Sequence, residues 1–365
     1  MIRVLHLLDV AADHETETAA RQLARDASKT FTVDARTIGR GGTYSTVLSA
    51  LLRLRRGREV DRFDVIHAFG ARAMTVATVA TPRPIVFSPN RFPGARDVRW
   101  LRAVAAVRDV HVVAPTEMMR RALVTRGLPF ERCHLIRPGV DFAQVKRRRD
   151  EALRGALGFA PDDYVILAPG ESTRAAAHSL AVWAASILHV LDPRYRLLLW
   201  GRGPLVMQAE RFAQRTHKHG LMEVAQRELR RRVPFEQLMS ATDAVLVTAT
   251  EPAPTLPLAV CMAAALPIVA LVTPTTSELL EDRHTALMVG RTAPRLLAQR
   301  VLDLRADPGL QWTISDMART ESYEYFSMTR FLSQWRAVYS QVASGQTVEV
   351  PQQAPGAGLR FHGRA

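Results

Sequence analysis

The sequence is poor in cysteine and contains no long apolar run. Its two cysteines, Cys133 and Cys261, have neither the spacing of a disulfide framework nor that of a metal site. No segment reaches the roughly 18 consecutive apolar residues that indicate a membrane-spanning helix. The N-terminal residues MIRVLHLLDVAADHE turn acidic too early for a secretory signal peptide. We therefore expect a cytoplasmic protein, in which Cys261 is an ordinary core residue on an apolar helix face.

Aromatic residues are also sparse, at 7% of the chain, whereas basic residues are abundant. The formal net charge is +14, and basic runs occur at residues 53–58, 146–149 and 227–232. Because few aromatic side chains accompany these runs and no nucleic-acid-binding module is recognised, a nucleic-acid partner is not expected. The runs are either solvated surface, which is the simpler interpretation, or a peripheral contact with an anionic membrane.

No internal repeat is found, and a chain of 365 residues is long enough for two domains. Strand-like and helix-like segments alternate along the first third of the sequence. Such alternation indicates a parallel sheet with helices on both faces. The predicted strands are residues 2–8, 31–35, 65–69, 85–88, 110–114 and 134–137, and the predicted helices are residues 17–27, 46–54, 71–80, 98–106 and 117–126.

A second alternating series follows a basic stretch that lacks any strand signal. This stretch, residues 143–160, is interpreted as an interdomain linker. The C-terminal residues 343–365 are rich in Pro, Gly and Gln, which predicts a disordered tail. The second series has predicted strands at residues 165–168, 195–200, 244–247, 268–272 and 286–289, and predicted helices at residues 179–191, 205–217 and 256–265.

Residues 243–272 form a strand, loop, helix and strand around which the second series is organised. The loop follows the carboxyl end of its first strand, where open α/β sheets bind their ligands. Glu251 lies in this loop and is the main candidate for a functional residue; a solvated loop glutamate is the alternative. Thr255 is a predicted helix cap and Pro257 a predicted first-turn residue, so the helix N-terminus would face an anion such as a phosphate.

Six segments of the chain carry a resemblance to a known family. They are DVIHAFGARA (64–73), VVAPTEMMRRALVTRGLPFERCHLIRPGVD (112–141), LLLWGRGP (197–204), DAVLVTATE with MAAALPIVA (243–251 and 262–270), TSELLEDRHTALMV (276–289) and FSMTRFLSQWRAVY (326–339). In this order and spacing they resemble glycosyltransferase family 4, whose members transfer a sugar from a UDP- or GDP-sugar with retention of anomeric configuration.

The resemblance implies the GT-B fold, in which two Rossmann-like doubly wound parallel-sheet domains of the α/β class face a central cleft. The implied parts are an acceptor-side domain at residues 1–142, a nucleotide-sugar domain at residues 161–325, and a C-terminal helix at residues 326–342 that packs toward the first domain. The implied reaction is metal-independent and uses a nucleotide-diphospho-sugar as co-substrate, with no other cofactor. Its acceptor would be a glycan, a lipid or a small molecule, met in the cytoplasm or at the inner face of the membrane.

The resemblance also assigns roles to single residues. Glu251 would contact the donor sugar, and His67 would contact the acceptor; a hydrogen-bonded structural histidine is the alternative for His67. Glu278 would lie beside the donor, or it would be a first-turn helix acid favoured by the helix dipole. His178 is interpreted as a surface residue near a helix cap. The residues implied in donor binding are Gly170, Arg174, Gly201, Arg202, Gly203, Thr255, Leu256 and Glu278.

Several positions depart from the family pattern near the donor diphosphate. Glu171 stands where the family has an arginine, and Ala176 stands near its lysine. A carboxylate repels a diphosphate, so Arg174 or Arg202 would have to supply the missing positive charge.

Three further departures lie elsewhere. The second acidic position of the donor site falls on Ala259 or Val260, neither of which can accept a hydrogen bond from a ribose hydroxyl. Phe69 replaces the second histidine of the acceptor strand, and DVAADHETE (9–17) replaces a Gly-Gly loop. We expect that Lys at position 176 and Glu at position 259 or 260 would raise the affinity for nucleotides.

Three functions are consistent with these observations. The first is a retaining glycosyltransferase. The second is a pseudo-glycosyltransferase, in which the same fold is kept as a binding or assembly module after loss of the cations and the second Glu. The third is a nucleotide-sugar isomerase or a phosphorylase on the same fold, although no lysine resembles a cofactor-bearing site.

Overall fold

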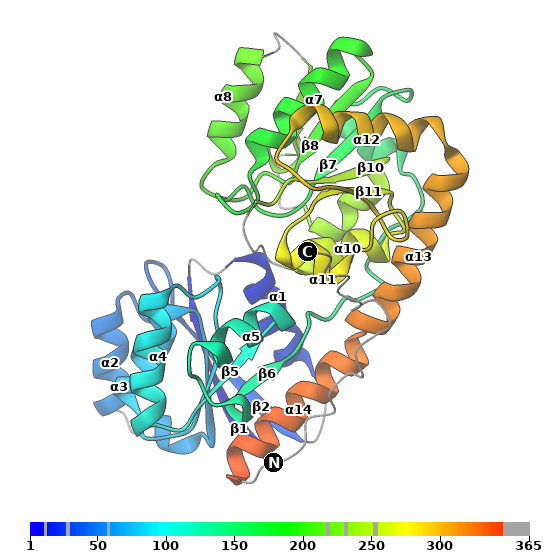
Figure 1. Ribbon diagram of the computed structural model, residues 1–365. Helices are drawn as coiled ribbons and strands as arrows, with labels where there is room; N and C mark the ends of the chain where they lie inside the picture. The colour runs from blue at the N-terminus through cyan, green and yellow to red at the C-terminus, as the bar shows by residue number, and fades with distance from the viewer. Residues whose placement is uncertain are drawn as a thin grey trace. The chain divides into compact units, whose positions relative to one another are not determined.

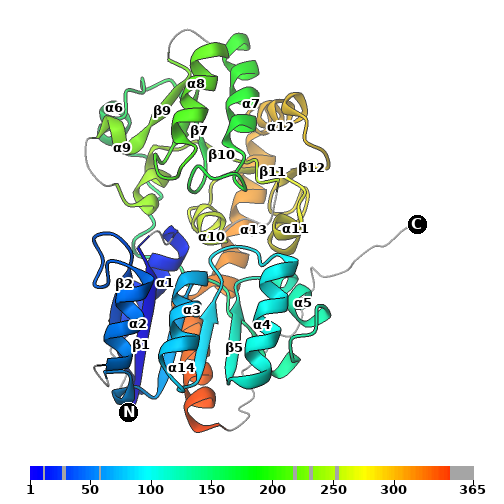
Figure 2. The same ribbon diagram turned by 90° about the vertical axis from the view of Figure 1, so that its left-hand side faces the viewer.

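The structure is a computed structural model that describes residues 1–10, 13–26, 30–56, 59–216, 220–229, 233–250 and 255–345. The chain forms two compact units. Unit 1 consists of Met1–Gly139 together with Met328–Ala365, and unit 2 consists of Val140–Ser327. Each unit is built around one six-stranded sheet whose paired strands are parallel (Figures 1 and 2). The predicted α/β class with two doubly wound sheets is confirmed.

The sheet of unit 1 has the strand order β2-β1-β3-β4-β5-β6. Strands β3 and β5 are buried along their whole length, as expected of parallel strands covered by helices on both faces. The strands are β1 (Ile2–Asp9), β2 (Phe31–Ile38), β3 (Val65–Phe69), β4 (Ile85–Ser88), β5 (Val110–Ala114) and β6 (Cys133–Leu135). The helices are α1 (His14–Arg25), α2 (Val47–Arg56), α3 (Ala71–Ala80), α4 (Ala95–Val107), α5 (Glu117–Thr125) and α14 (Met328–Ser344), with short 3-10 turns at Glu59–Arg62 and Phe130–Arg132.

The two faces of this sheet pack against different helices because successive residues of a strand point to opposite faces. Leu5 and Leu7 of β1 join a core that includes side chains of α2, α3, α4 and α5. Val4 and Leu8 join a second core with side chains of α1 and α14. Figure 2 shows α14 on the opposite side of the sheet from α3 and α4.

Helix α14 is fixed to unit 1 by polar contacts as well as by its apolar face. It packs on β1, β3 and β4. The Arg336 guanidinium donates to both carboxylate oxygens of Asp26, at 2.9 and 2.6 Å. The chain therefore returns to the N-terminal sheet after completing unit 2.

The sheet of unit 2 has the strand order β12-β11-β10-β7-β8-β9. Side chains of α7, α8 and α12 share a core with one face, and side chains of α10 share a core with the other. The strands are β7 (Tyr164–Ala168), β8 (Tyr195–Leu199), β9 (Met222–Val224), β10 (Ala244–Val247), β11 (Ile268–Leu271) and β12 (Leu287–Val289). The helical elements are α6 (Glu151–Ala156), α7 (His178–Leu191), α8 (Val206–Thr216), α9 (Ala225–Glu228), the 3-10 segment η3 (Phe235–Ala241), α10 (Leu256–Ala263), α11 (Pro274–Leu279), α12 (Pro294–Ala306) and α13 (Pro308–Phe326).

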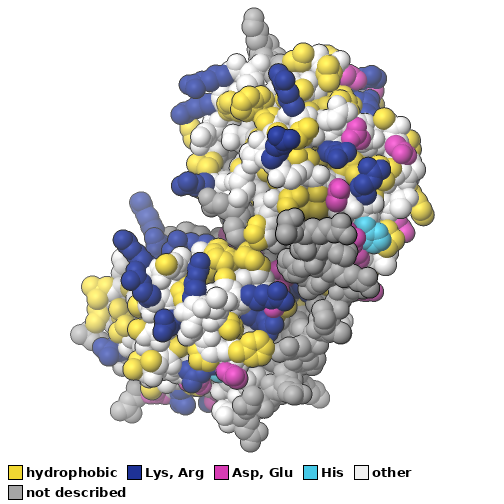
Figure 3. Space-filling model, viewed as in Figure 1, with side chains coloured by type: hydrophobic (Ala, Val, Ile, Leu, Met, Phe, Trp, Pro, Cys, Tyr) yellow, Lys and Arg dark blue, Asp and Glu magenta, His cyan; other side chains and the backbone are white. Residues whose placement is uncertain are grey.

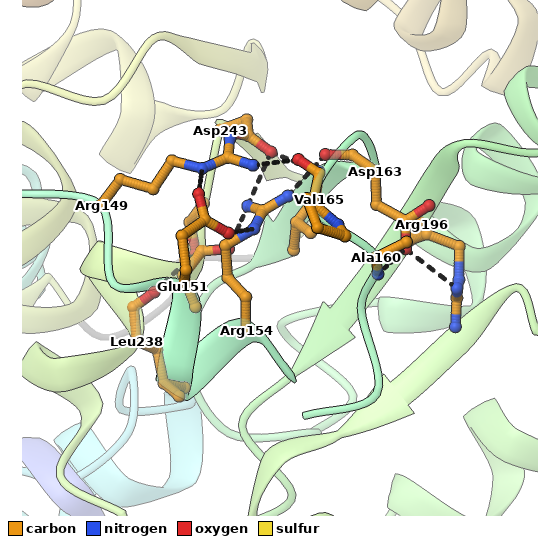
Figure 4. A network of polar contacts seen from close by, with 12 residues as sticks. Arg149, Glu151, Arg154, Ala160, Asp163, Val165, Arg196, Leu238 and Asp243 are labelled. Atoms are coloured by element: carbon orange, nitrogen blue, oxygen red, sulfur yellow. Dashed lines mark hydrogen bonds and ion pairs between the residues drawn. The ribbon is translucent and has the colours of Figure 1, made fainter. Parts of the chain in front are cut away.

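The basic stretch that we interpreted as a linker is part of unit 2. It contains α6, whose N-cap Asp150 accepts a hydrogen bond from the Leu153 amide. Arg154 of this helix is completely buried. Its guanidinium donates to the Asp243 carboxylate at 3.0 Å and to the carbonyl oxygens of Ala241 and Asp163, at 2.9 and 2.5 Å (Figure 4).

Asp243 is the common acceptor of this network at the amino-terminal edge of the sheet. Besides Arg154, it accepts from Arg149 at 2.9 Å and from the Val165 amide at 2.7 Å. Arg149 also pairs with Glu151. The positive charges of residues 149 and 154 are thus balanced inside unit 2, which explains why a stretch that looks solvated is folded.

Residues 343 and 344 complete α14, and residues 346–365 of the expected disordered tail lie outside the described residues. Across the part of the chain that the structure describes, no helix combines the length and the apolar character needed to cross a membrane.

Candidate functional site

The candidate site lies in unit 2 at the carboxyl ends of β7, β8 and β10. In the sheet β7 is flanked by β8 and β10, whereas the chain passes from β7 through β8 and β9 before it reaches β10. At such a reversal of strand order, open α/β sheets bind their ligands. Glu251 was expected in the loop after β10, but residues 251–254 lie outside the described residues.

The loop after β7 is hydrogen-bonded to the turn after β8. The Ser172 amide donates to the carbonyl of Arg202 at 2.7 Å, and the Leu205 amide donates to the carbonyl of Ser172 at 2.9 Å. Gly203 has φ +106°, and a Cβ there would lie 2.6 Å from the backbone nitrogen of Ser172. Gly201 has φ +95°. Both glycines are therefore required by the backbone of the turn, as the sequence indicated.

The other end of the same loop is hydrogen-bonded to the end of β10. The Thr250 amide donates to the Ala175 carbonyl at 3.2 Å, and the Thr248 hydroxyl donates to the Ala176 carbonyl at 2.9 Å. Ala177 then adopts a left-handed conformation with φ +50°, and α7 begins at His178. The loop is thus held on both sides, with Ala176 half-buried where the family pattern suggests a lysine.

His178 is not a surface residue, contrary to the prediction. It is buried, its Nδ1 lies 2.6 Å from the Ser172 hydroxyl and its Nε2 lies 3.3 Å from the Pro169 carbonyl. Because a carbonyl can only accept, Nε2 carries the proton and Nδ1 accepts from Ser172. Burial lowers the pKa of His178 to about 4, so the ring is neutral at pH 7 and fixes the loop.

Gly170 brings the end of β7 close to the first turn of α10. Its φ is +84°, and a Cβ at this position would lie 3.4 Å from Cγ of Pro257. Thr255 occupies the N-cap position of α10 and Pro257 the first turn, as predicted, but the Thr255 backbone is already helical and its side chain does not cap the described helix. Leu256 is buried in the core, so only its backbone could face a ligand.

The two positions considered for a ribose-binding glutamate are both inaccessible. Ala259 and Val260 are 0% and 1% exposed, within a helix that is buried on all sides. A glutamate at either position would place a carboxylate in an apolar core. We therefore expect Glu at position 259 or 260 to destabilise unit 2, and not to raise nucleotide affinity as the sequence suggested.

The charged groups of the site are paired with one another. Arg202 Nε lies 3.4 Å from Oε1 of Glu171, and its guanidinium carbon lies 5.1 Å from the centre of the Trp200 ring. Arg174 is exposed on the same loop as Glu171. The sequence suggested that Arg202 could replace a missing cation; it did not reveal that Arg202 is already paired with a carboxylate.

Glu278 lies on α11, which is preceded by Thr273 as its N-cap. The Thr273 hydroxyl accepts from the Thr276 amide at 3.2 Å, so the helix starts four residues before Glu278. Glu278 is therefore in the last turn of a six-residue helix, and the interpretation as a first-turn acid is wrong. Its assignment beside the donor stays a prediction.

His67 belongs to unit 1 and is completely buried. Its Nδ1 lies 2.7 Å from the Tyr339 hydroxyl, and its Nε2 lies 2.9 Å from the Ser88 hydroxyl. Its ring stacks on Phe69 with a centroid distance of 3.8 Å. Burial, with a smaller contribution from His6, holds the pKa of His67 well below its usual range. These contacts favour the structural alternative for His67.

Comparison with known proteins supports the resemblance. The sequence model of Glycosyltransferase Family 4 matches residues 6–144. Among curated protein sequences, none matches this chain. The fold is similar to that of Anabaena HepE in complex with UDP and glucose, with a TM-score of 0.78, 18% identity, and coverage of 93% of this chain and 100% of that chain.

Two other solved structures share the fold. Sucrose-phosphate synthase from Thermosynechococcus elongatus has a TM-score of 0.76 at 15% identity and covers 94% of this chain and 100% of its own. A glycosyltransferase from Rickettsia africae ESF-5 has a TM-score of 0.69 at 14% identity, with coverage of 93% and 98%. Residues 6–144 are thus similar to glycosyltransferase family 4, and the two parallel-sheet units have the GT-B fold of these solved structures.

Proposed function

We propose that this protein transfers a sugar from a UDP- or GDP-sugar to an acceptor hydroxyl, with retention of anomeric configuration and without a metal ion. The single observation that carries the proposal is the edge of the unit 2 sheet where the strand order reverses. There the loop after β7 contacts both the turn after β8, which holds Arg202, and the first turn of α10. HepE, which shares the fold, has been crystallised with UDP and with UDP-glucose.

In this proposal the protein acts by positioning the donor and neutralising its charge. The positive φ of Gly170, Gly201 and Gly203 lets the backbone approach the donor closely. Arg202 and the amides at the start of α10 face the diphosphate. Glu251 contacts the sugar, and a phosphate oxygen of the donor takes the proton of the acceptor hydroxyl. Such a reaction depends on orientation and electrostatic stabilisation more than on a dedicated base.

A pseudo-glycosyltransferase is the second candidate, and specific observations favour it. The lysine position holds Ala176, the arginine position holds Glu171, and Ala259 and Val260 are buried in the core. A chain that had lost transfer activity would keep the fold as a binding or assembly module. The two candidates differ in whether the donor is bound and consumed.

The acceptor is proposed to be a glycan, lipid or small molecule that the protein meets in the cytoplasm or at the inner face of the membrane. Support for peripheral membrane contact comes from α4, which exposes Arg96, Arg99, Arg102 and the Trp100 ring. Figure 3 shows Lys and Arg side chains gathered over α2, α3 and α4 of unit 1. Cosedimentation with anionic and with neutral vesicles tests this point, and equal binding to both would contradict an electrostatic contact.

The decisive experiment measures donor binding and consumption by the full chain. Isothermal titration calorimetry with UDP, GDP and their glucose and mannose conjugates should give micromolar binding to one nucleotide, and Glu251→Ala should weaken the binding of the conjugate. Release of free nucleotide from the bound conjugate, unchanged by EDTA, supports the enzyme. Binding without release supports the pseudoenzyme, and the absence of binding to any of these ligands contradicts the nucleotide-sugar site.

A further inference from the structure

The ion pair between Glu171 and Arg202 occupies the position where a donor diphosphate would need positive charge. Arg202 follows β8 and Glu171 follows β7; these strands are neighbours, and β7 also borders β10, where the strand order reverses. The side chains are only 16% and 22% exposed for Glu171 and Arg202, respectively. Arg202, in the turn after β8, is thus already paired with a carboxylate of the protein, that of Glu171.

The backbone holds these two residues together. In the sheet Ala168 pairs with Leu199, and the same offset extended by three residues brings Glu171 opposite Arg202. The hydrogen bonds between Ser172 and the turn after β8, at 2.7 and 2.9 Å, keep this register beyond the last strand pair. The backbone hydrogen bonds between the two loops therefore place Glu171 opposite Arg202, so that the ion pair does not depend on side-chain rotamers alone.

Arg202 is also restrained on its other side. Its guanidinium lies 5.1 Å from the centre of the Trp200 ring, a distance at which cations are attracted to the ring face. The Trp200 indole is fixed in turn, because it donates to the Val233 carbonyl at 2.9 Å. The positive charge stays beside Glu171 when no ligand is bound.

A phosphate that approaches Arg202 meets the Glu171 carboxylate at the same position. Two anions close to one cation repel each other, and partial burial reduces the screening of that repulsion by water. The phosphate must therefore displace the carboxylate or accept weaker binding. Either outcome lowers the affinity for the ligand without any change in its other contacts.

We propose that Glu171 is an internal competitor for the diphosphate of the nucleotide ligand and that it sets the affinity and the salt dependence of the site. This inference rests on the proposed function, because it concerns the same nucleotide site. The ligand class it addresses is a nucleoside diphosphate or its sugar conjugate. Release of Glu171 from Arg202 is then the step that makes the site competent for a diphosphate.

The test compares the wild-type chain with Glu171→Gln, which keeps the shape of the side chain and removes its charge. Calorimetry with UDP, GDP and inorganic pyrophosphate should give about tenfold tighter binding to the variant, the size expected for loss of one repulsive contact at a partly buried site. The gain should shrink as the salt concentration rises. Adding Arg202→Met to the variant should remove most of the gain, because both effects act through the same pair.

Two further variants separate the pair from general effects of charge. Asp303→Asn removes one negative charge from a half-exposed pair with Arg300 on α12 and should leave the affinity unchanged. Glu171→Asp keeps the charge but shortens the side chain, so the carboxylate reaches Arg202 less well and affinity should rise to an intermediate value. Thermal unfolding followed by circular dichroism checks that each variant is folded.

The outcomes distinguish this inference from the function on which it rests. Tighter binding to Glu171→Gln or Glu171→Asp, but not to Asp303→Asn, supports the competitor. If the wild type binds a nucleotide and neither variant at position 171 binds it more tightly, the role of Glu171 as a competitor is overturned. The nucleotide site itself then stands. If no folded variant binds UDP, GDP or pyrophosphate, both the competitor inference and the proposed nucleotide site are overturned, because there would be no bound diphosphate for Glu171 to compete with.

Discussion

The hydroxyl of Tyr339 lies 2.7 Å from Nδ1 of His67 and 3.0 Å from Nε2 of His6, so one side chain of α14 joins the neighbouring strands β1 and β3. All three side chains are completely buried. A hydroxyl can donate one hydrogen bond and accept another, so Tyr339 can pair with one nitrogen of each imidazole at once. Tyr339→Phe should destabilise unit 1 by about 1–3 kcal/mol, because two buried polar groups lose a partner.

Urea denaturation measures this loss, and hydrogen exchange of the amides of β1 and β3 assigns it to unit 1. Tyr323→Phe is the matched control, because that side chain lies on the surface of α13 and is 44% exposed. Equal stability of the two variants would show that the contact of Tyr339 with the histidines contributes nothing.

The burial of His178 predicts a pH dependence for unit 2. The pKa of this residue is lowered from 6.5 to about 4 by burial, so in this interval the unfolded chain binds a proton that the folded chain does not. The contribution to stability is complete above pH 6.5 and is lost progressively as the pH falls toward 4. The slope is about 1.4 kcal/mol per pH unit for one such group. His178→Asn should reduce this slope in urea denaturation at pH 7, 6 and 5; a slope equal to that of the wild type contradicts the prediction.

The buried network around Asp243 predicts a large effect for Arg154→Met. The Asp243 carboxylate and two carbonyl groups would lose a charged donor inside unit 2. Removal of one partner from a buried ion pair costs about 3–5 kcal/mol. Arg300→Met, which breaks a half-exposed pair with Asp303, should cost no more than about 1 kcal/mol. Chemical denaturation of both variants measures the difference in the free energy of unfolding. Similar losses in the two variants would indicate that the Arg154 network contributes little to stability.

Gly203→Ala should disrupt the proposed nucleotide site with little effect on the core. The added methyl group would lie 2.6 Å from backbone atoms of Ser172, and the φ of +106° is unfavourable for alanine. The turn after β8 would move away from the loop after β7 and take Arg202 with it. Gly290→Ala is the control, because no atom lies within 4 Å of a Cβ added there. Calorimetry should show loss of nucleotide binding only for Gly203→Ala; unchanged binding would place the ligand elsewhere.

Ala176→Lys tests the alignment of the loop after β7 with the family pattern. Position 176 is half-buried, so a lysine can extend from the loop without entering the core. One added cation beside a diphosphate should raise nucleotide affinity by about tenfold at low salt, as measured by calorimetry. Ser179→Lys is the control, because it adds the same charge at an exposed position in the first turn of α7. An equal rise for both variants would indicate a general effect of charge.

Most helices and strands of both sheets could be predicted because their signals are local, whereas the short elements β9 (Met222–Val224) and α6 (Glu151–Ala156) were not predicted. Runs such as Val65–Phe69 are buried throughout, and the helices between them have apolar residues at helical spacing. The turns at Gly201 and Gly203 were also predictable, because the need for positive φ depends on the residue itself. Cys261, expected in the core, is completely buried.

The errors arose where the partner is distant in sequence. The interpretation of residues 143–160 as a linker did not anticipate the burial of Arg154, because its acceptor Asp243 lies 89 residues away. His178 looked like a surface residue because nothing local indicates that Ser172 and Pro169 enclose it. The pairing of Glu171 with Arg202 was also missed. Each residue lies three positions beyond the end of one of two adjacent parallel strands, so their pairing follows only once the register of those strands is known.

The return of α14 to the sheet of unit 1 has a consequence for synthesis on the ribosome. Unit 2 is contiguous, from Val140 to Ser327, whereas unit 1 lacks one of its covering helices until Met328–Ser344 has left the exit tunnel. During translation the face of β1, β3 and β4 that carries His6 and His67 therefore stays open while the whole of unit 2 is made. Helix α14 thus completes a sheet that is made before unit 2, and a nascent chain that ends at Ser327 would lose part of its N-terminal core and none of its C-terminal unit.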